Sequence, residues 1–428
     1  MSKTEASPQT GWAKQASVPA VVAGYPLLEV LRTCRMQALS PEEGYGRAPF
    51  NVMAHSARQW TDADRDFVTP ANDLLYSNAW VDLRAGPVVL EIPAATRYFV
   101  VECLDVYTNN FLNLGTRNVP PEGGRFALLA PGTDETQAPA GTRPVHCPTP
   151  LVWLLGRVLV DGPHDLEAAR AMQAGFDLKG PSIAWPMASL AGWQEGGDPA
   201  LDFFSNLARA LADFPPPADL RAPFELMASA HIRLPASGSL TRLRPSSLEG
   251  LRQAHAEGMA LIEGHTRSAS KLAWRYSTRL GRFGDDYMLR AATAMKGIAA
   301  LSADEAVYAL ADYDHQGEPL HGGRVYQIRF DDGGDLPADM FWSITLYGED
   351  RFLAGNTLGR HALGNRSPLQ READGALVLE VSHRAPPGPA SNWLPAPDAP
   401  FYLILRLYHP QTRLLQGEYR FPGVERIA

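Results

Sequence analysis

The sequence predicts a mainly β protein with a helical insert, and two observations lead to this fold class. Apolar runs rich in β-branched and aromatic residues, which are typical of strands, concentrate before residue 160 and after residue 306. Helix-capping signals concentrate between these two regions. Short strands at regular spacing favour an antiparallel sandwich. We therefore expect a flexible tail over residues 1–18, a β-sandwich over residues 19–160, a helical insert over residues 161–305 and a second β domain over residues 306–428.

The clearest strand–turn–strand signal lies in residues 72–117, where apolar runs cover residues 83–92 and 98–111. Side chains alternate across a strand, so Glu102 and Asp105 fall on opposite faces, each among apolar neighbours. A carboxylate on a buried face must be paired, hydrogen-bonded or neutralised. We expect Glu102 or Asp105 to make a charge-assisted bond to an arginine, with candidates Arg97, Arg117 and Arg406. Alternatively, apolar surroundings raise the pKa of Asp105 and make it a general acid or base.

Helix signals are local and specific. An apolar stripe over residues 21–36 predicts a short helix before the first strands. Asp198 is a good N-cap, with Pro199 at the first helical position. Residues 246–249 (SSLE) match a capping box that opens a long helix, and a third helix is expected over residues 286–301.

The remaining strands follow from short apolar runs bounded by turn residues. We expect them over residues 125–129, 152–160, 306–313, 324–330, 340–347, 376–381 and 401–408. In the last of these, alternation places Tyr402, Ile404, Arg406 and Tyr408 on one face. Arg406 is therefore a candidate buried cation.

Composition excludes several classes of protein. The formal net charge is −8 and no basic block occurs, so nucleic acid is not an expected partner. No apolar stretch approaches the length of a membrane span, and the first residues contain no apolar segment of the signal-peptide type. We expect a cytoplasmic protein without a membrane partner. The three cysteines, Cys34, Cys103 and Cys147, are too few and too widely spaced to suggest a disulfide framework.

No motif for a metal or an organic cofactor stands out, and we expect neither. The sequence has no HxH and no HExxH, and it lacks the glycine-rich loops that bind nucleotides. A β domain could still gather His361, His383 and His409 around a metal, but solvated or buried histidines are the simpler interpretation.

Two sets of residues are candidates for a ligand site. Asn72, Asp73 and Tyr76 could hold a ligand or metal where loops meet a sandwich rim, although Asn and Asp are also common turn residues at strand entries. The second set could line a pocket for an apolar or aromatic ligand with one anionic group, or could simply fill a β core; it comprises Trp342, Tyr347, Asn356, Arg360, Asn392 and Trp393.

Segments in both β regions resemble known families. Residues 72–77 (NDLLYS), 86–90 (GPVVL), 105–108 (DVYT) and 115–117 (GTR) are similar to the bacterial family of domain of unknown function 1254. Residues 341–347 (FWSITLY), Asn356, Arg360, residues 392–397 (NWLPAP) and residues 405–408 (LRLY) resemble its usual companion, domain of unknown function 1214. Leu74 stands where the first family usually has threonine. The resemblance implies an immunoglobulin-like sandwich, a helical middle and a C-terminal jelly roll, without a settled activity.

The function expected from these patterns is a small-molecule-binding enzyme. We expect a cofactor-independent hydrolase or lyase that uses carboxylate acid–base chemistry in a cavity between the domains. The alternative is a non-catalytic ligand-binding or assembly protein, and a homo-oligomer is expected. Candidate catalytic residues are Asp105 and Asp73. Candidate substrate-binding residues are Tyr76, Tyr107, Arg117, Trp342, Tyr347, Asn356, Arg360 and Trp393. In particular, Tyr76, Asp105, Tyr107, Trp342 and Arg360 are expected to share this cavity.

Overall fold

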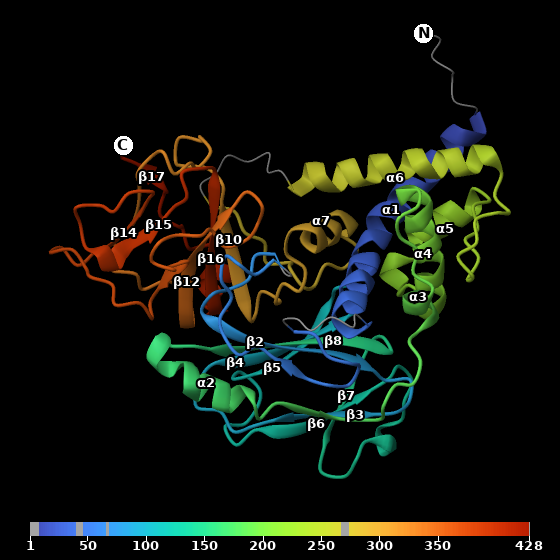
Figure 1. Cartoon of the computed structure of the whole chain (residues 1–428), viewed down its shortest axis with the longest axis horizontal. Coiled ribbons are helices and arrows are strands. Elements are labelled where there is room, and N and C mark those ends of the chain that lie inside the picture. The colour runs from blue at the N-terminus through green and yellow to red at the C-terminus, as the bar shows by residue number, and fades with distance from the viewer. Residues whose placement is uncertain (1–7, 40–45, 66–67, 267–273, 428) are drawn as a thin grey trace, which may run out of the picture.

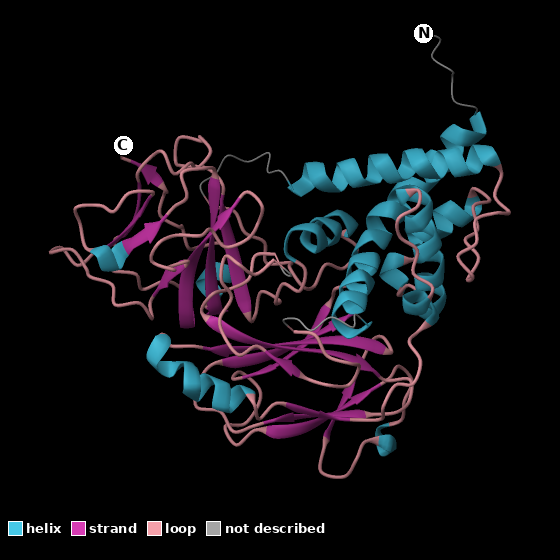
Figure 2. Ribbon diagram, viewed as in Figure 1, coloured by secondary structure: helices cyan, strands magenta, loops and turns pink. Residues whose placement is uncertain are grey.

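The computed structural model describes residues 8–39, 46–65, 68–266 and 274–427. It contains two β-sheet regions and a group of helices that lies beside them (Figure 1, Figure 2). The predicted β-rich fold with a helical part is confirmed. Within the described ranges, no helix combines the length and the hydropathy that crossing a membrane requires.

The N-terminal sandwich consists of two sheets that share one apolar core. The first sheet has the order β1 (Ala54–His55), β2 (Leu74–Asp82), β8 (Leu151–Leu159), β4 (Phe99–Asp105) and β5 (Asn110–Gly115). The second has the order β7 (Arg143–His146), β6 (Gly124–Leu129), β3 (Val88–Ile92) and β9 (Asp177–Lys179). Alternate residues of both sheets, such as Val101, Leu154 and Leu90, fill the space between them. Because β9 pairs with β3, the sandwich extends beyond the predicted boundary at residue 160.

The strand predicted over residues 98–111 is in fact a hairpin. β4 ends at Asp105 and β5 begins at Asn110. The Asp105 carboxylate closes the turn: Oδ1 accepts the backbone N–H groups of Tyr107 and Asn109, both at 2.9 Å, and Oδ2 accepts the Asn109 side-chain amide at 2.8 Å. This is the usual way in which an aspartate stabilises a turn, and the alternation rule alone does not detect it.

Six of the helices form one group although they come from two parts of the chain. This group comprises α1 (Pro8–Cys34), which runs into the π-helical turn η1 (Arg35–Leu39), and α3 (Ala188–Ala191), α4 (Pro199–Asp213), α5 (Ala222–Ser229), α6 (Pro245–Thr266) and α7 (Tyr287–Gly297). The tail predicted over residues 1–18 is wrong for residues 8–18, which belong to α1; residues 1–7 lie outside the described ranges. Buried small residues such as Ala13 and Ala16 pack this end of α1 against its neighbours.

Two of the predicted helix starts are confirmed by their caps. Asp198 accepts the backbone N–H groups of Ala200 and Leu201 at the start of α4. Asp286 accepts the Leu289 N–H at the start of α7. The capping box at residues 246–249 does not open α6, because this helix begins at Pro245 and the Ser246 hydroxyl donates instead to the side chain of Gln9 at 3.4 Å.

Close contact between α1 and α6 depends on glycine. A Cβ atom at Gly250 would lie 2.5 Å from Ala13 Cβ, and one at Gly258 would lie 2.6 Å from Val21 Cγ1. Both distances are shorter than van der Waals contact, so the two helices could not approach this closely with any other residue at either position.

The C-terminal region is a second sandwich. One sheet has the order β10 (Ala306–Ala311), β16 (Phe401–Pro410), β12 (Ala338–Gly348) and β13 (Ala362–Gly364), and the other has the order β15 (Trp393–Pro395), β14 (Leu377–Ser382), β11 (Tyr326–Phe330) and β17 (Glu425–Arg426). Val307, Ile328 and Leu405 belong to the core that the sheets share. The jelly-roll topology remains a prediction. The other helical segments are η2 (Glu135–Gln137), η3 (Pro163–Asp165), α2 (Leu166–Gln173), η4 (Ala218–Leu220), η5 (Ala390–Asn392) and α8 (Thr412–Leu415).

A further core joins the three parts, and we call it the interdomain core. It is formed by the helices and by one face of each sandwich. In the first sandwich this is the face of β2, β4 and β8 that points away from the sandwich's own core, and in the second it is the corresponding face of β10, β12 and β16. Tyr98 of the first sandwich contacts Phe341 and Tyr408 of the second edge to face, with ring centroids 5.2 and 5.3 Å apart. β4 and β16 are therefore buried on both of their faces.

Candidate functional site

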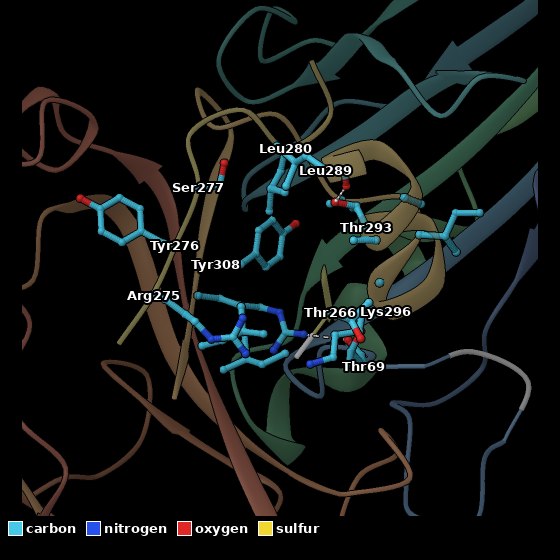
Figure 3. Close-up of a pocket in the computed structure, with 18 of the residues that line it drawn as sticks. Thr69, Thr266, Arg275, Tyr276, Ser277, Leu280, Leu289, Thr293, Lys296 and Tyr308 are labelled. Atoms are coloured by element: carbon cyan, nitrogen blue, oxygen red, sulfur yellow. Dashed lines mark hydrogen bonds between the residues drawn. The ribbon is translucent and has the colours of Figure 1, made fainter. Parts of the chain in front are cut away.

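A cavity of about 280 Å³ opens within the interdomain core. Its walls come from β2 and β8 of the first sandwich, β10 and β16 of the second, the end of α6, one face of α7 and residues 275–280 (Figure 3). This volume is near the lower end of the range for ligand pockets, so the cavity suits a small molecule. Its position where three parts meet agrees with the expected location of a ligand site.

The polar side chains of the cavity are cations, phenols and aliphatic hydroxyls, together with His265. Its cations are Arg157, Arg275, Lys296 and Arg406, and its walls include Tyr76, Tyr308, Tyr402 and Tyr408. Among the residues that the structure describes, no aspartate or glutamate lines the cavity. Apolar residues such as Leu289, Ile298 and Ile404 complete the wall. The lining therefore favours an anion with an apolar body.

Arg157 enters the cavity from the first sandwich and is paired. On β8 it lies opposite Tyr76 of β2 and Val100 of β4. Its Nη1 donates to Glu102 Oε2 at 2.7 Å, which confirms the expected charge-assisted bond between Glu102 and an arginine. Burial raises the pKa of Glu102 to about 7, and the nearby Arg157 guanidinium opposes this rise. The partner differs from the predicted arginines because strand register, which brings β8 beside β4, decides the pairing.

Arg406 enters the cavity from the second sandwich and has no such partner. It is 3% exposed, as its predicted place on a buried strand face requires. Its Nη1 donates to Thr345 Oγ1 at 3.2 Å and its Nη2 to the Thr69 carbonyl at 2.7 Å. The guanidinium carbon also lies 5.8 Å from the ring centre of Tyr308. Within the described residues, no carboxylate comes within 4 Å of it.

Backbone carbonyls from two left-handed residues hold the two arginines. Thr69, with φ of 53°, accepts from Arg406, and Ala299, with φ of 62°, accepts from Arg157 at 2.9 Å. Non-glycine residues rarely adopt this conformation, and a β-branched threonine does so least readily. Both residues also line the cavity. The strained backbone thus coincides with the site, as is common where surrounding structure fixes a functional geometry.

The third and fourth cations lie toward the helices. Arg275 forms an ion pair with Asp312. Lys296, like Thr266 and Thr69, lines the cavity (Figure 3). Burial lowers the pKa of Lys296; the negative charge of Asp312 opposes this decrease, and the positive charges of Arg275 and Arg351 add to it. Tyr276 turns its ring away from the cavity (Figure 3), and its hydroxyl donates to the Leu414 carbonyl at 3.2 Å.

A buried polar network joins the two sandwiches beside the Glu102–Arg157 pair. The Tyr98 hydroxyl donates to Glu305 Oε1 at 2.7 Å, and His409 Nε2 lies 3.2 Å from the same oxygen. Burial raises the pKa of Tyr98, and the negative charge of Glu305 adds to this effect. The phenol therefore remains a hydrogen-bond donor, and this network fixes β4 of the first sandwich against the second.

Of the predicted site residues, only Tyr76 lines the cavity. Its hydroxyl accepts the backbone N–H of Ala71 at 2.9 Å. Tyr347 contacts Arg406 without lining the cavity, and the guanidinium carbon of Arg406 lies 5.6 Å from the centre of the Tyr347 ring. The Tyr347 hydroxyl donates to the Pro70 carbonyl at 2.7 Å. Asp73 is buried close to the site without lining it. Its burial raises its pKa, while the Ser343 hydroxyl and the Arg406 charge oppose the rise.

The other predicted residues of the first sandwich have structural contacts. Asp105 closes the β4–β5 turn, as described above. The Tyr107 hydroxyl donates to the Phe214 carbonyl at 2.6 Å and so attaches this turn to the end of α4. Arg117 is exposed. The expectation that Asp105 and Tyr107 share the cavity is therefore wrong, because the turn directs both side chains elsewhere.

The predicted residues of the second sandwich also lie outside the cavity. Trp342 points into the sandwich core, where its Nε1 donates to the Gly334 carbonyl at 2.9 Å. Asn356 makes two hydrogen bonds to the backbone of Arg360, at 3.1 and 2.8 Å, and closes a loop. Arg360 donates to the Trp393 carbonyl at 2.9 Å, and Trp393 Nε1 donates to the Ser382 carbonyl at 3.0 Å. Side chains alternate along β12, so Trp342 lies on the face that points away from the cavity.

Sequence reasoning missed Arg157, Arg275, Lys296 and Tyr308. A signal was present for Arg157, which is a lone cation within the apolar run at residues 151–160. Arg275 lies on a loop, Lys296 on one face of α7 and Tyr308 on β10. No local sequence pattern shows that β10 is buried on its second face. The three histidines considered as metal ligands have separate contacts: His361 with the Ala354 carbonyl, His383 with the Ala396 carbonyl and His409 with Glu305.

Two family models match parts of this chain, and one solved structure has a similar fold over nearly its whole length. Residues 50–180 match the family model described as "Protein of unknown function (DUF1254)", and residues 305–412 match that described as "Protein of unknown function (DUF1214)". The crystal structure of the VPA0106 protein from Vibrio parahaemolyticus is similar over 98% of this chain and 100% of that one, with a TM-score of 0.70 and 23% identity. An uncharacterized protein from Burkholderia cenocepacia matches over 93% of this chain and 86% of its own, with a TM-score of 0.48 and 12% identity. A search of curated proteins finds no match.

Proposed function

We propose that this chain, which belongs to the two-domain DUF1254/DUF1214 family, binds a small organic anion in the interdomain cavity. The observation that carries the proposal is Arg406. This guanidinium is always charged at physiological pH, is 3% exposed, and lacks a carboxylate within ion-pair distance among the described residues. A buried cation with no carboxylate in direct contact is costly, and a bound carboxylate would supply that contact.

The surroundings of Arg406 define the class of ligand. Lys296 adds an amine, whereas Arg157 and Arg275 are each paired with a carboxylate. Tyr76, Tyr308 and the apolar wall suit a compact aromatic or aliphatic body. The ligand class is therefore a small carboxylic acid or a similar monoanion.

The geometry supports binding more directly than the expected acid–base chemistry. A hydrolase or lyase that relies on a carboxylate needs that group within hydrogen-bond reach of its substrate. No described aspartate or glutamate lines the cavity, and Asp105 is used by a turn. Cytoplasmic localisation and a homo-oligomeric state remain predictions.

Thermal-shift measurements with matched ligands test this function. Benzoate, phenylacetate and hexanoate should each stabilise the wild-type protein more than the corresponding neutral amides. A ligand at a hundred times its Kd adds about 2.7 kcal/mol to the free energy of unfolding. Equal shifts with acids and amides, or no shift with any of the acids, would contradict the proposal.

Variants locate the binding site. Arg406→Met removes the cation and should abolish the difference between acid and amide. Leu289→Trp leaves every arginine in place but fills the cavity from α7, so it should abolish binding of both the acid and the amide. Arg366→Gln is the matched control, because Arg366 forms an exposed ion pair with Asp161 far from the cavity lining, and it should bind as the wild type does. Retained acid-specific binding in both cavity variants would place the site elsewhere.

A further inference from the structure

Lys296 is placed on the one helix face that borders the cavity. Leu289, Ala292, Thr293 and Lys296 all line it, and their spacing of three, four and seven residues is that of a single α-helical face. α7 thus presents two apolar residues, a hydroxyl and an amine to the space that Arg406 faces from β16.

A purely structural role does not account for this amine. A lysine in the last turn of a helix often bonds the free carbonyls there. In α7, however, Arg351 already donates to the Met295 carbonyl at 2.8 Å. Across the described residues, Lys296 forms neither an ion pair nor a hydrogen bond. The amine is therefore available to a ligand.

The environment favours the neutral, nucleophilic form of the amine. Ala292 and Ile298, each less than a tenth exposed, provide apolar surface nearby. Asp312 favours the charged amine, whereas Arg275 and Arg351 provide like charge that disfavours it, and burial is the largest influence. Desolvation and neighbouring cations are the two conditions that activate lysine as a nucleophile, since both lower its pKa. The direction of the pKa shift at Lys296 agrees with this arrangement.

We infer that Lys296 forms an imine with a carbonyl group of the anion that Arg406 binds, which makes the ligand a small 2-oxo acid or a related carbonyl acid. This inference rests on the proposed function, because Arg406 must hold the carboxylate. The amine nitrogen attacks the carbonyl carbon, a C=N bond replaces the C=O bond, and the oxygen leaves as water with the two protons of the amine. No oxidant, reductant or metal is required.

Tyr308 can assist this step. Its hydroxyl accepts the backbone N–H of Leu301 at 3.3 Å and donates to no described residue, so its proton remains available for the carbonyl oxygen. Burial raises the pKa of Tyr308 to about 12, with Glu102 adding to the rise and Arg157 and Arg406 opposing it, so the phenol stays protonated at neutral pH.

Reductive trapping tests the imine. The full-length protein is incubated with pyruvate or phenylpyruvate and sodium cyanoborohydride, which reduces an imine to a stable secondary amine, and the modified lysine is located by peptide mass spectrometry. The chain has few lysines, so the assignment is direct. We expect saturable modification of Lys296, suppressed by benzoate as a competing acid without a reactive carbonyl. Lys179, exposed and paired with Glu91, is the internal control and should be modified far less.

Three variants complete the experiment. Lys296→Arg keeps a long basic side chain but removes the primary amine, so it should lose the adduct while still showing the benzoate-dependent thermal shift. Lys179→Ala should leave the adduct unchanged. Tyr308→Phe should slow trapping and leave the position of the adduct the same.

The outcomes separate this inference from the proposed function. If benzoate binds through Arg406 but pyruvate and phenylpyruvate leave Lys296 unmodified, the imine is excluded and anion binding stands. Equal modification of Lys179 and Lys296 would also exclude it. If Lys296 is still modified in Arg406→Met, the amine is reactive but Arg406 does not hold the carboxylate.

Discussion

The two sandwiches each send a buried arginine into the same cavity, but they treat its charge differently. Arg157 of the first sandwich is held by Glu102 at 2.7 Å, whereas Arg406 of the second donates to a hydroxyl and a carbonyl and contacts two tyrosine rings. Both guanidinium groups are nearly inaccessible to bulk solvent. In a buried ion pair each charge compensates the other. A buried charge without such a partner can still attract an oppositely charged ligand. The contrast distinguishes a structural arginine from one that can bind a ligand, although both look alike in the sequence.

Removal of Glu102 gives the largest expected effect. Glu102→Ala leaves Arg157 buried without its counter-ion and should lower the free energy of unfolding by about 3–5 kcal/mol. Urea unfolding at pH 8 measures the loss. The double change Glu102→Ala with Arg157→Ala should recover part of it, because the unpaired charge is then gone. A loss below about 0.5 kcal/mol would show that the pair contributes as little as an exposed one.

The pH dependence of the same pair comes next in size. The pKa of Glu102 is raised from 4.5 to about 7 in the folded state. The folded protein therefore binds this proton more tightly than the unfolded chain does. Its contribution to stability is complete below pH 4.5 and is lost as the pH rises through 7, a change of about 3 kcal/mol. The difference in unfolding free energy between wild type and Glu102→Gln, followed from pH 4.5 to 8, isolates this contribution. A difference that stays constant, or grows in favour of the wild type with pH, would contradict the raised pKa.

The unpaired arginine should matter less for stability. Arg406→Met removes hydrogen bonds to Thr345 and Thr69 but leaves no partner carboxylate within ion-pair distance, so a loss of about 1–3 kcal/mol is expected. The same urea experiment measures it without ligand. A loss as large as that of Glu102→Ala would mean that Arg406 is as firmly compensated as Arg157, and the comparison between the two would fail.

The smallest expected effect concerns the backbone that holds Arg406. Thr69→Gly relieves a left-handed conformation at the cost of greater flexibility in the unfolded chain, and the two terms nearly cancel. We expect a gain in stability of about 1 kcal/mol or less, measured by calorimetry. Weaker binding of benzoate at the same time would show that the rigid carbonyl is needed to orient the guanidinium. Ala299→Gly is the matched change beneath Arg157 and should leave benzoate binding unaltered.

Local sequence patterns predicted the features that depend on one element. Alternation identified the face of β16 that bears Arg406, and the N-cap at Asp198 gave the start of α4. The pairing of Glu102 with Arg157 depends on which strand lies beside β4, and the place of Lys296 depends on where α7 crosses the sheets. Such relations arise from tertiary packing, which is why most predicted cavity residues proved to have structural roles instead.

The early part of α1 was missed for a different reason. Pro19 and Pro26 lie inside this helix, and proline lacks the N–H that an interior helical position uses. The missed residues 8–18 are mostly small or polar and gave little apolar signal. Contacts with α4, α5, α6 and α7 stabilise the helix despite both prolines, an example of packing that outweighs local propensity.

The position of α1 also has a consequence for synthesis on the ribosome. Its main partner α6 begins at Pro245, roughly 210 residues after α1 ends, and translation at about 5–20 residues per second takes roughly 10–40 seconds to reach it. During this interval the surface of α1 that packs on α6, including Ala13 and Val21, lacks its native partner. That surface stays uncovered while the first sandwich can already fold.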